Sequence, residues 1–304
     1  MIKSITVTNH MGESIKLELT RPEKSGFIVL NAEGLVEPVK ANINTSKVAA
    51  TDGALYNSAY LDVRDITLEL QYLESSDETA EDIRLKSYKY FPEKRRIRIV
   101  TETDRRIVET YGYVEHNKPT VFSDSVGSTI TILCEDPYLY NATPNITLFS
   151  GVTPKFHFPF SNASTTEPEL IFGEIYRHTE AVIYYDGDSE VGVYINIHAV
   201  GDVTNLTIHN VSSRQKMTID TTKLAKLTGS GIIAGDNIVI ETSRNKKKIT
   251  LTRDGVDINI MNCLDRGTDW ITLTKGDNII AYTADVGNTD LQFTVTNKIA
   301  YEGA

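Results

Sequence analysis

The amino-acid sequence predicts a mainly β protein of two domains, and three observations lead to this prediction. Apolar and polar residues alternate along most of the chain, which is typical of strands that bury one face. A single segment has helical spacing bounded by start and stop signals. Five of the nine prolines lie between Asp136 and Glu169 and divide the strand-like segments into two groups. The length of 304 residues also favours two cores over one.

The first domain is expected to span residues 1–137 and to have a β-rich α+β fold with one helix. The helix is predicted to begin after Ser75-Ser76-Asp77-Glu78, in which Ser75 and Glu78 have capping-box spacing, and to stop at Phe91 and Pro92. Strands are predicted where apolar residues recur at every second position, over residues 1–8, 66–72, 96–100, 107–114 and 128–134.

Residues 138–168 are expected to connect the domains, because proline removes ladder hydrogen bonds, and to include one short strand over residues 155–158. The second domain is then expected to span residues 169–304 and to form a β-sandwich, since short strands recur at close spacing. Asp254-Gly255 is one of several turn signals between these strands. They are predicted over residues 181–185, 192–198, 206–209, 215–220, 237–242, 248–252, 270–273, 278–283 and 291–296.

Charge and hydropathy exclude two classes of partner. The net charge of −10 argues against tight nucleic-acid binding, because a chain that repels phosphate gains little from counterion release. It remains compatible with DNA that only passes by. No apolar run approaches the length that a bilayer span requires, so no membrane partner is expected. The N-terminus also lacks the apolar region of a signal peptide, so cytoplasmic synthesis is expected.

The sequence offers no catalytic or metal-binding pattern. Cys134 and Cys263 are far apart and are expected to be buried free thiols. Asp186, Asp188 and Glu190 are better explained as a hairpin turn than as a calcium loop. No nucleophile elbow, phosphate loop or dinucleotide fingerprint occurs, and no spacing selects a pair of carboxylates. We therefore expect no catalytic residue, no cofactor and no metal, and hence no enzyme.

One aromatic residue and two histidines are candidates for contacts. Trp270, the only tryptophan, begins a predicted strand, and a ring of this size more often supplies core or interface area than a sugar-stacking platform. His198 and His209 each lie near a strand end and are expected to face each other as a structural pair across a hairpin.

A set of short segments, in order along the chain, resembles one family. In the C-terminal part they are Gly235-Asp236-Asn237-Ile238-Val239-Ile240-Glu241-Thr242, Lys248-Ile249-Thr250-Leu251, Asn262-Cys263-Leu264-Asp265, Trp270 to Asn278 and Tyr301-Glu302-Gly303. In the N-terminal part they are Ala50-Thr51-Asp52-Gly53, Arg64-Asp65-Ile66-Thr67-Leu68, Arg84 and Cys134-Glu135-Asp136-Pro137-Tyr138. Together they resemble the siphophage distal tail protein family over nearly the whole chain. The proline-rich segment does not align, and Thr268 stands where the family often has serine.

This resemblance implies a structural role at the tip of a phage or phage-like tail. The first domain would form a six-fold ring that continues the tail tube, with sheets lining a channel that DNA passes as cargo. The second domain would be a peripheral galectin-like or carbohydrate-module-like sandwich. Expected partners are further copies of the chain in a hexameric ring, the tail tube protein, the tail-associated lysin or fibre hub protein and, in some relatives, a receptor-binding protein. The expected location is the virion tail tip, assembled in the bacterial host cytoplasm.

A closed ring requires two different, complementary surfaces on each copy. For this interface we predict the cationic strand with Arg95, Arg96 and Arg98, where arginines alternate with isoleucines, and the helix with Glu81 and Arg84. A solvated or protected strand face is the alternative explanation of the arginines.

Two other classes of function remain as alternatives. In a carbohydrate-binding adhesin, the second domain would recognise host-wall glycan and Trp270 would stack on a sugar. A wall hydrolase would need a carboxylate pair or a zinc site, which the sequence does not show. The sequence also does not decide between a siphophage, a contractile tail and a tail-like bacteriocin.

Overall fold

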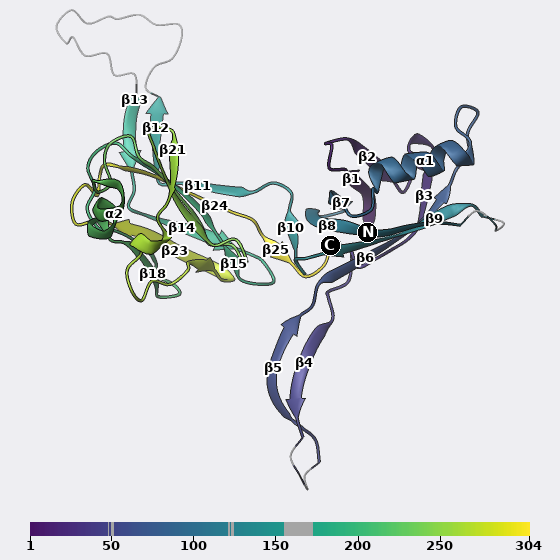
Figure 1. Ribbon diagram of the computed structural model, residues 1–304, viewed down its shortest axis with the longest axis horizontal. Helices are drawn as coiled ribbons and strands as arrows, with labels where there is room; N and C mark the ends of the chain where they lie inside the picture. The colour runs from purple at the N-terminus through teal and green to yellow at the C-terminus, as the bar shows by residue number, and fades with distance from the viewer. Residues whose placement is uncertain (48, 50–51, 121, 123–124, 155–172) are drawn as a thin grey trace, which may run out of the picture. The chain divides into compact units, whose positions relative to one another are not determined.

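The computed structural model is mainly β, which confirms the predicted fold class (Figure 1). It describes residues 1–47, 49, 52–120, 122, 125–154 and 173–304. The chain folds into two compact units, one of residues 1–143 with 300–304 and one of residues 144–299. Neither α1 nor α2, the two α-helices of the described residues, is long and apolar enough to cross a bilayer.

The first unit is built on one large antiparallel sheet with the strand order β2-β1-β7-β8-β9-β6-β3. Apolar side chains alternate with polar ones along these strands, so one face of the sheet is buried and the other is open. The strands are β1 (Ile2–Thr8), β2 (Ser14–Glu18), β3 (Phe27–Glu33), β6 (Arg64–Tyr72), β7 (Arg96–Thr103), β8 (Ile107–Thr120) and β9 (Gly127–Cys134). A short 3₁₀ turn, Pro22–Lys24, precedes β3.

Helix α1 (Ala80–Tyr90) covers the buried face and places Ile83 in the core. The predicted capping box was misplaced by one turn. Thr79 caps the helix, and Asp82 closes the box by accepting from the Thr79 backbone N–H at 3.0 Å. Ser75 instead forms a tight turn, in which its Oγ accepts from the Glu78 backbone N–H at 3.1 Å. The segment thus has two residue pairs at capping-box spacing, Ser75 with Glu78 and Thr79 with Asp82, and the helix begins at the second.

A two-stranded hairpin, β4 (Ala41–Ser46) and β5 (Leu55–Leu61), forms a separate ribbon in the first unit (Figure 1). We call it the arm. Nearly all of its side chains are exposed, and a few are half-buried. An isolated two-stranded ribbon has little stability of its own in water.

The domain boundaries differ from the prediction at both places where the chain passes from one unit to the other. Strand β10 (Leu139–Asn141) pairs with β8, and the last strand, β25 (Ala300–Tyr301), pairs with β10, so both belong to the first unit. The predicted connection over residues 138–168 is therefore partly structured. Its residues 155–168, including the short strand predicted over 155–158, lie outside the described residues.

Buried Arg64 donates hydrogen bonds to both chain segments that lie next to these boundaries. Its Nε donates to the Pro137 carbonyl at 2.9 Å, and its Nη2 donates to the Glu302 carbonyl. Its Nη1 donates to the carbonyls of Gly34 and Glu37, the latter at 3.1 Å. Burial lowers the pKa of this guanidinium, and the nearby anionic groups oppose that effect. One side chain thus ties the chain leaving the first unit to the chain returning to it.

The second unit is a β-sandwich, as predicted, with two main antiparallel sheets. One sheet has the order β11-β24-β16-β19-β20-β21 and the other β14-β23-β17-β18. Tyr282 of β23 stacks on Phe293 of β24 with ring centroids 4.9 Å apart, which places the sheets face to face. The first sheet comprises β11 (Asn145–Leu148), β24 (Leu291–Asn297), β16 (Tyr194–Ala199), β19 (Asn237–Glu241), β20 (Lys248–Arg253) and β21 (Val256–Asn259). The second comprises β14 (Glu180–Tyr185), β23 (Gly276–Thr283), β17 (Leu206–Asn210) and β18 (Gln215–Ile219).

Short elements complete the second unit. Helix α2 (Thr221–Thr228), which was not predicted, is capped by Asp220 at its start and by Gly229 in the left-handed conformation at its end. A 3₁₀ turn spans Met261–Cys263. Two further strand pairs are β12 (Ser150–Pro154) with β13 (Gly173–Arg177), and β15 (Val191–Gly192) with β22 (Thr272–Leu273).

Candidate assembly surfaces

The cationic strand lies on the open face of the first sheet. Ile97 and Ile99 of β7 are buried in the core, so Arg96 and Arg98 point to the opposite side. Arg98 is already neutralised, because its Nε donates to Glu109 Oε2 at 2.8 Å and this carboxylate is almost fully buried. The same hydrogen bond raises the pKa of Arg98. The strand therefore presents less free positive charge than the sequence indicates.

Aromatic side chains accompany these arginines. The Arg96 guanidinium lies 4.6 Å from the centroid of the Tyr111 ring, which is a cation–π distance. Arg96 pairs in register with Tyr113, and Tyr113 pairs with Leu133 on the next strand. Both tyrosines and Leu133 are more than one third exposed. The open face, formed here by Arg96, Arg98, Tyr111, Tyr113 and Leu133, thus mixes apolar and charged contact area.

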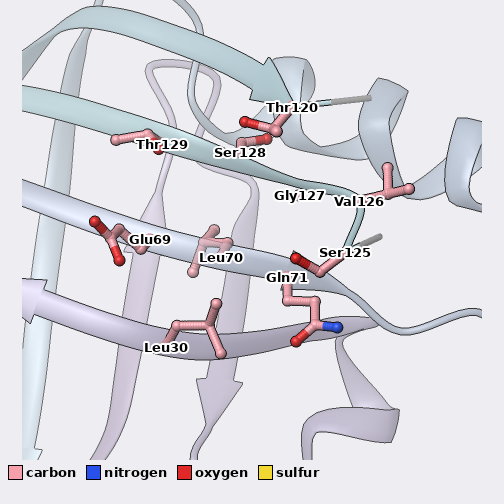
Figure 2. A pocket seen from close by; sticks show the side chains of 10 residues that line it. All are labelled: Leu30, Glu69, Leu70, Gln71, Thr120, Ser125, Val126, Gly127, Ser128 and Thr129. Carbon is pink, nitrogen blue, oxygen red and sulfur yellow. The ribbon is translucent and has the colours of Figure 1, made fainter. Parts of the chain in front are cut away.

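A shallow hollow of about 140 Å³ lies farther along the sheet, where β3, β6 and β9 meet the end of β8 (Figure 2). Figure 2 shows the exposed side chain of Leu30 beside the polar side chains of Glu69 and Gln71. Glu69 is the only titratable group among the described residues that line the hollow. A single carboxylate in an open hollow lacks the partner that acid–base chemistry requires.

The predicted helix residues lie on the other side of the same sheet. Arg84 Nη2 contacts Glu81 Oε1 at 2.9 Å, so the two residues pair with each other along the exposed side of α1. Because α1 covers the core face, Glu81 and Arg84 do not join Arg96 and Arg98 in one patch. Leu85 of α1 is 54% exposed and adds apolar area to this surface.

The arm is the third surface, and sequence reasoning missed it. Ile43, Leu55, Tyr56 and Tyr60 have between 57% and 66% of their surface exposed. An arm with four large exposed apolar side chains and no core of its own is a typical contact element. The alternation in Asn42–Ser46 was the available signal, but polar residues on both faces obscured it.

Trp270 lies in the second unit, before β22, and is half-buried. The ammonium of Lys247 lies 5.3 Å from the centroid of its ring. The ring and the ammonium are at a cation–π distance.

The predicted histidine pair was wrong. His198 belongs to β16 and His209 to β17, which are in different sheets. His198 instead lies with its Nδ1 2.8 Å from Asn237 Oδ1, and His209 with its Nε2 3.3 Å from Thr283 Oγ1.

Reactive groups do not converge within the described residues. No group of three or more histidine, cysteine, aspartate or glutamate side chains there has the geometry of a metal site. Cys134 and Cys263 are both buried free thiols. Burial raises the pKa of Cys134 to about 11 and raises that of Cys263 as well, so neither thiol is activated as a nucleophile.

Known proteins resemble this chain in part of its sequence and in its fold. Residues 186–296 match the sequence profile described as siphovirus-type tail component, C-terminal domain. No curated protein matches the chain in sequence. The fold is similar to that of the crystal structure of SPP1 Dit (gp 19.1), described as a paradigm of hub adsorption apparatus in Gram-positive infecting phages, with 13% identity over 97% of this chain and 98% of that chain, and a TM-score of 0.63. A chain of the phage P2 baseplate in its activated conformation with Ca is 10% identical over the full length of both chains, with a TM-score of 0.49.

Proposed function

We propose that this chain is a structural hub of a phage or phage-like tail tip, because residues 186–296 match the profile of a siphovirus-type tail component, C-terminal domain. In this proposal six copies close into a ring that continues the tail tube. The ring joins the tube protein on one side to the tail-associated lysin or fibre hub protein on the other. The role is positional and needs no catalysis.

The arm is the observation that carries the proposal. Its exposed residues Ile43, Leu55, Tyr56 and Tyr60 require a surface, and a ring offers one on the neighbouring copy. Two tyrosines suit such a contact, because they supply large, rigid area at low entropic cost. The overall likeness in fold to SPP1 Dit, a hub protein by its description, supports the same conclusion.

The open face and α1 suit the remaining interface. A ring closes head to tail, so each copy must present two different surfaces. Arg96 and Arg98 lie on one side of the sheet layer, and Glu81 and Arg84 on the other. We retain these residues, with Arg95, as the proposed interface.

The negative net charge is compatible with a channel through which DNA passes. With a net charge of −10, the chain repels phosphate and would let DNA pass without holding it. A receptor-binding protein at the rim and a location at the virion tail tip belong to the same proposal.

Sedimentation velocity of the full chain tests the proposal. The native protein should form a species of about six times 33.9 kDa as its concentration rises. A Tyr56→Lys, Tyr60→Lys variant should require at least about tenfold more protein to assemble, because it places charge in a dry contact. The matched control carries Leu227→Lys and Val256→Lys, two exposed apolar positions of the second unit, and should assemble as the native protein does. Equal assembly of the arm variant and the control would refute the role of the arm.

A further inference from the structure

Strand β14 is an edge strand of the second unit in the described part of the chain. It pairs only with β23, so its other side carries no strand within the described residues. It has six residues, whereas the other edge strands of the two main sheets, β11, β18 and β21, have four or five. Proteins usually protect such edges with lysine, proline or a bulge, and Glu180–Tyr185 contains none of these.

The backbone of β14 fixes which groups face the free edge. Thr179 accepts a hydrogen bond from the Tyr282 backbone N–H at 2.9 Å, directly before β14. In an antiparallel pair every second residue bonds to the partner strand, so Ala181 and Ile183 point their backbone groups toward β23. The backbone N–H and C=O groups of Glu180, Val182 and Tyr184 therefore point away from β23, where they can form hydrogen bonds with the backbone of an added strand.

The side chains beside this edge offer apolar contact. Val182 is 61% exposed and Tyr184 is 66% exposed, on the same face of the sheet. Ile279 lies directly opposite Val182 on β23 and is 36% exposed. Two exposed residues at alternate positions, with a third behind them, match the side-chain period of one extended peptide.

Carboxylates flank this apolar strip. Glu180 stands at the start of β14, Asp186 follows its end, and Asp277 lies opposite Tyr184. Asp188 and Glu190 follow in the same loop. Lys275 lies near these carboxylates, with its Nζ 3.7 Å from Asp186 Oδ1. Carboxylates therefore outnumber cations among the described side chains beside β14, and a positively charged partner complements them.

We propose that β14 binds an extended segment of another protein, with basic residues at its ends and apolar residues at alternate central positions, as an added strand. Main-chain hydrogen bonds to Glu180, Val182 and Tyr184 supply the pairing, and the carboxylates select the basic ends. This inference goes beyond the proposed ring and does not depend on it, because β14 belongs wholly to the second unit.

Peptide binding to the full chain tests it. The probe is Lys-Lys-Thr-Val-Thr-Val-Thr-Lys-Lys, labelled with a fluorophore and titrated by anisotropy. Its control is the same peptide with the five central amides N-methylated, which keeps the charges and the valines but cannot pair as a strand. The protein variants are Val182→Lys and, as matched control, Val256→Lys, an exposed valine of edge strand β21 in the other sheet. Far-UV circular dichroism verifies that both variants are folded.

We expect saturable binding of the probe that weakens with salt, and a dissociation constant at least about tenfold higher for Val182→Lys. Val256→Lys should leave the constant unchanged. Absence of binding, equal binding of the N-methylated peptide, or equal loss in both variants would overturn the proposal. Binding of a soluble wall polysaccharide that Tyr184→Ala abolishes, with neither peptide bound, would overturn it in favour of a glycan. None of these failures bears on assembly of the ring.

Discussion

Replacing buried Arg64 should weaken the first unit and leave the second unchanged. Arg64 is 1% exposed and donates to four backbone carbonyls, those of Gly34, Glu37, Pro137 and Glu302. Arg64→Met keeps much of the side-chain length and removes all of these hydrogen bonds. Each bond from a charged donor contributes about 1.5–3 kcal/mol, but the carbonyl of the C-terminal tail can turn to water. The other three bonds would sum to about 4.5–9 kcal/mol, but bonds from one donor group do not add in full, and methionine keeps part of the apolar packing. We therefore expect a loss of about 3–5 kcal/mol in the free energy of unfolding.

Two spectroscopic probes separate the units in a urea titration. Trp270 is the only tryptophan and lies in the second unit, so its fluorescence reports that unit alone. Far-UV circular dichroism reports both. In the Arg64→Met variant the dichroism should acquire an early transition. The free energy of unfolding of the second unit, followed by tryptophan fluorescence, should stay within about 0.5 kcal/mol of the native value. Arg96→Met, at an exposed arginine stacked on Tyr111, is the control and should cost less than about 1 kcal/mol. A loss of stability in Arg64→Met no greater than that in Arg96→Met would show that the Arg64 hydrogen bonds do not stabilise the first unit.

Three further predictions concern packing, pH and thiol reactivity. A Cβ at Gly112 would lie 2.7 Å from Cys134 Sγ, so Gly112→Ala should destabilise the first unit by about 1–3 kcal/mol, whereas Gly231→Ala, with its nearest neighbour at 3.6 Å, should be nearly neutral in thermal unfolding. Hydrogen bonds from the first turn of α2 lower the pKa of Asp220, so its stabilising contribution is present above the unfolded pKa of about 4 and is lost as pH falls through the lower folded value. The stability difference between native protein and Asp220→Asn should thus shrink from pH 7 to pH 3, and a constant difference would contradict the cap. Cys134 and Cys263 should resist iodoacetamide at pH 8 in the native protein and react within minutes in urea, as mass spectrometry would detect; fast native labelling would contradict their burial.

Strands that bury one face could be predicted from the sequence. The alternation in β6 and β9 survives in the structure because each strand has a buried and an open side, so its pattern has period two. The turn at Asp254-Gly255 was equally predictable, since both residues adopt positive φ between β20 and β21.

Features fixed by tertiary contacts could not be predicted. The first unit receives the chain end because β25 pairs with β10 and Arg64 binds the Glu302 carbonyl, and nothing local in residues 300–304 indicates this. The neutralisation of Arg98 by Glu109 depends on the register of β7 and β8, which the sequence of neither strand specifies alone. That Arg96 and Arg98 lie on the opposite side of the sheet from Glu81 and Arg84 also depends on how the strands and α1 pack, so the sequence alone did not predict it.

Negative-stain electron microscopy of the purified full chain at rising concentration can show whether six copies of this chain close into a ring. We expect class averages with six-fold symmetry and a central opening. Closed two-fold dimers, open filaments, or single copies at the highest concentration would contradict it.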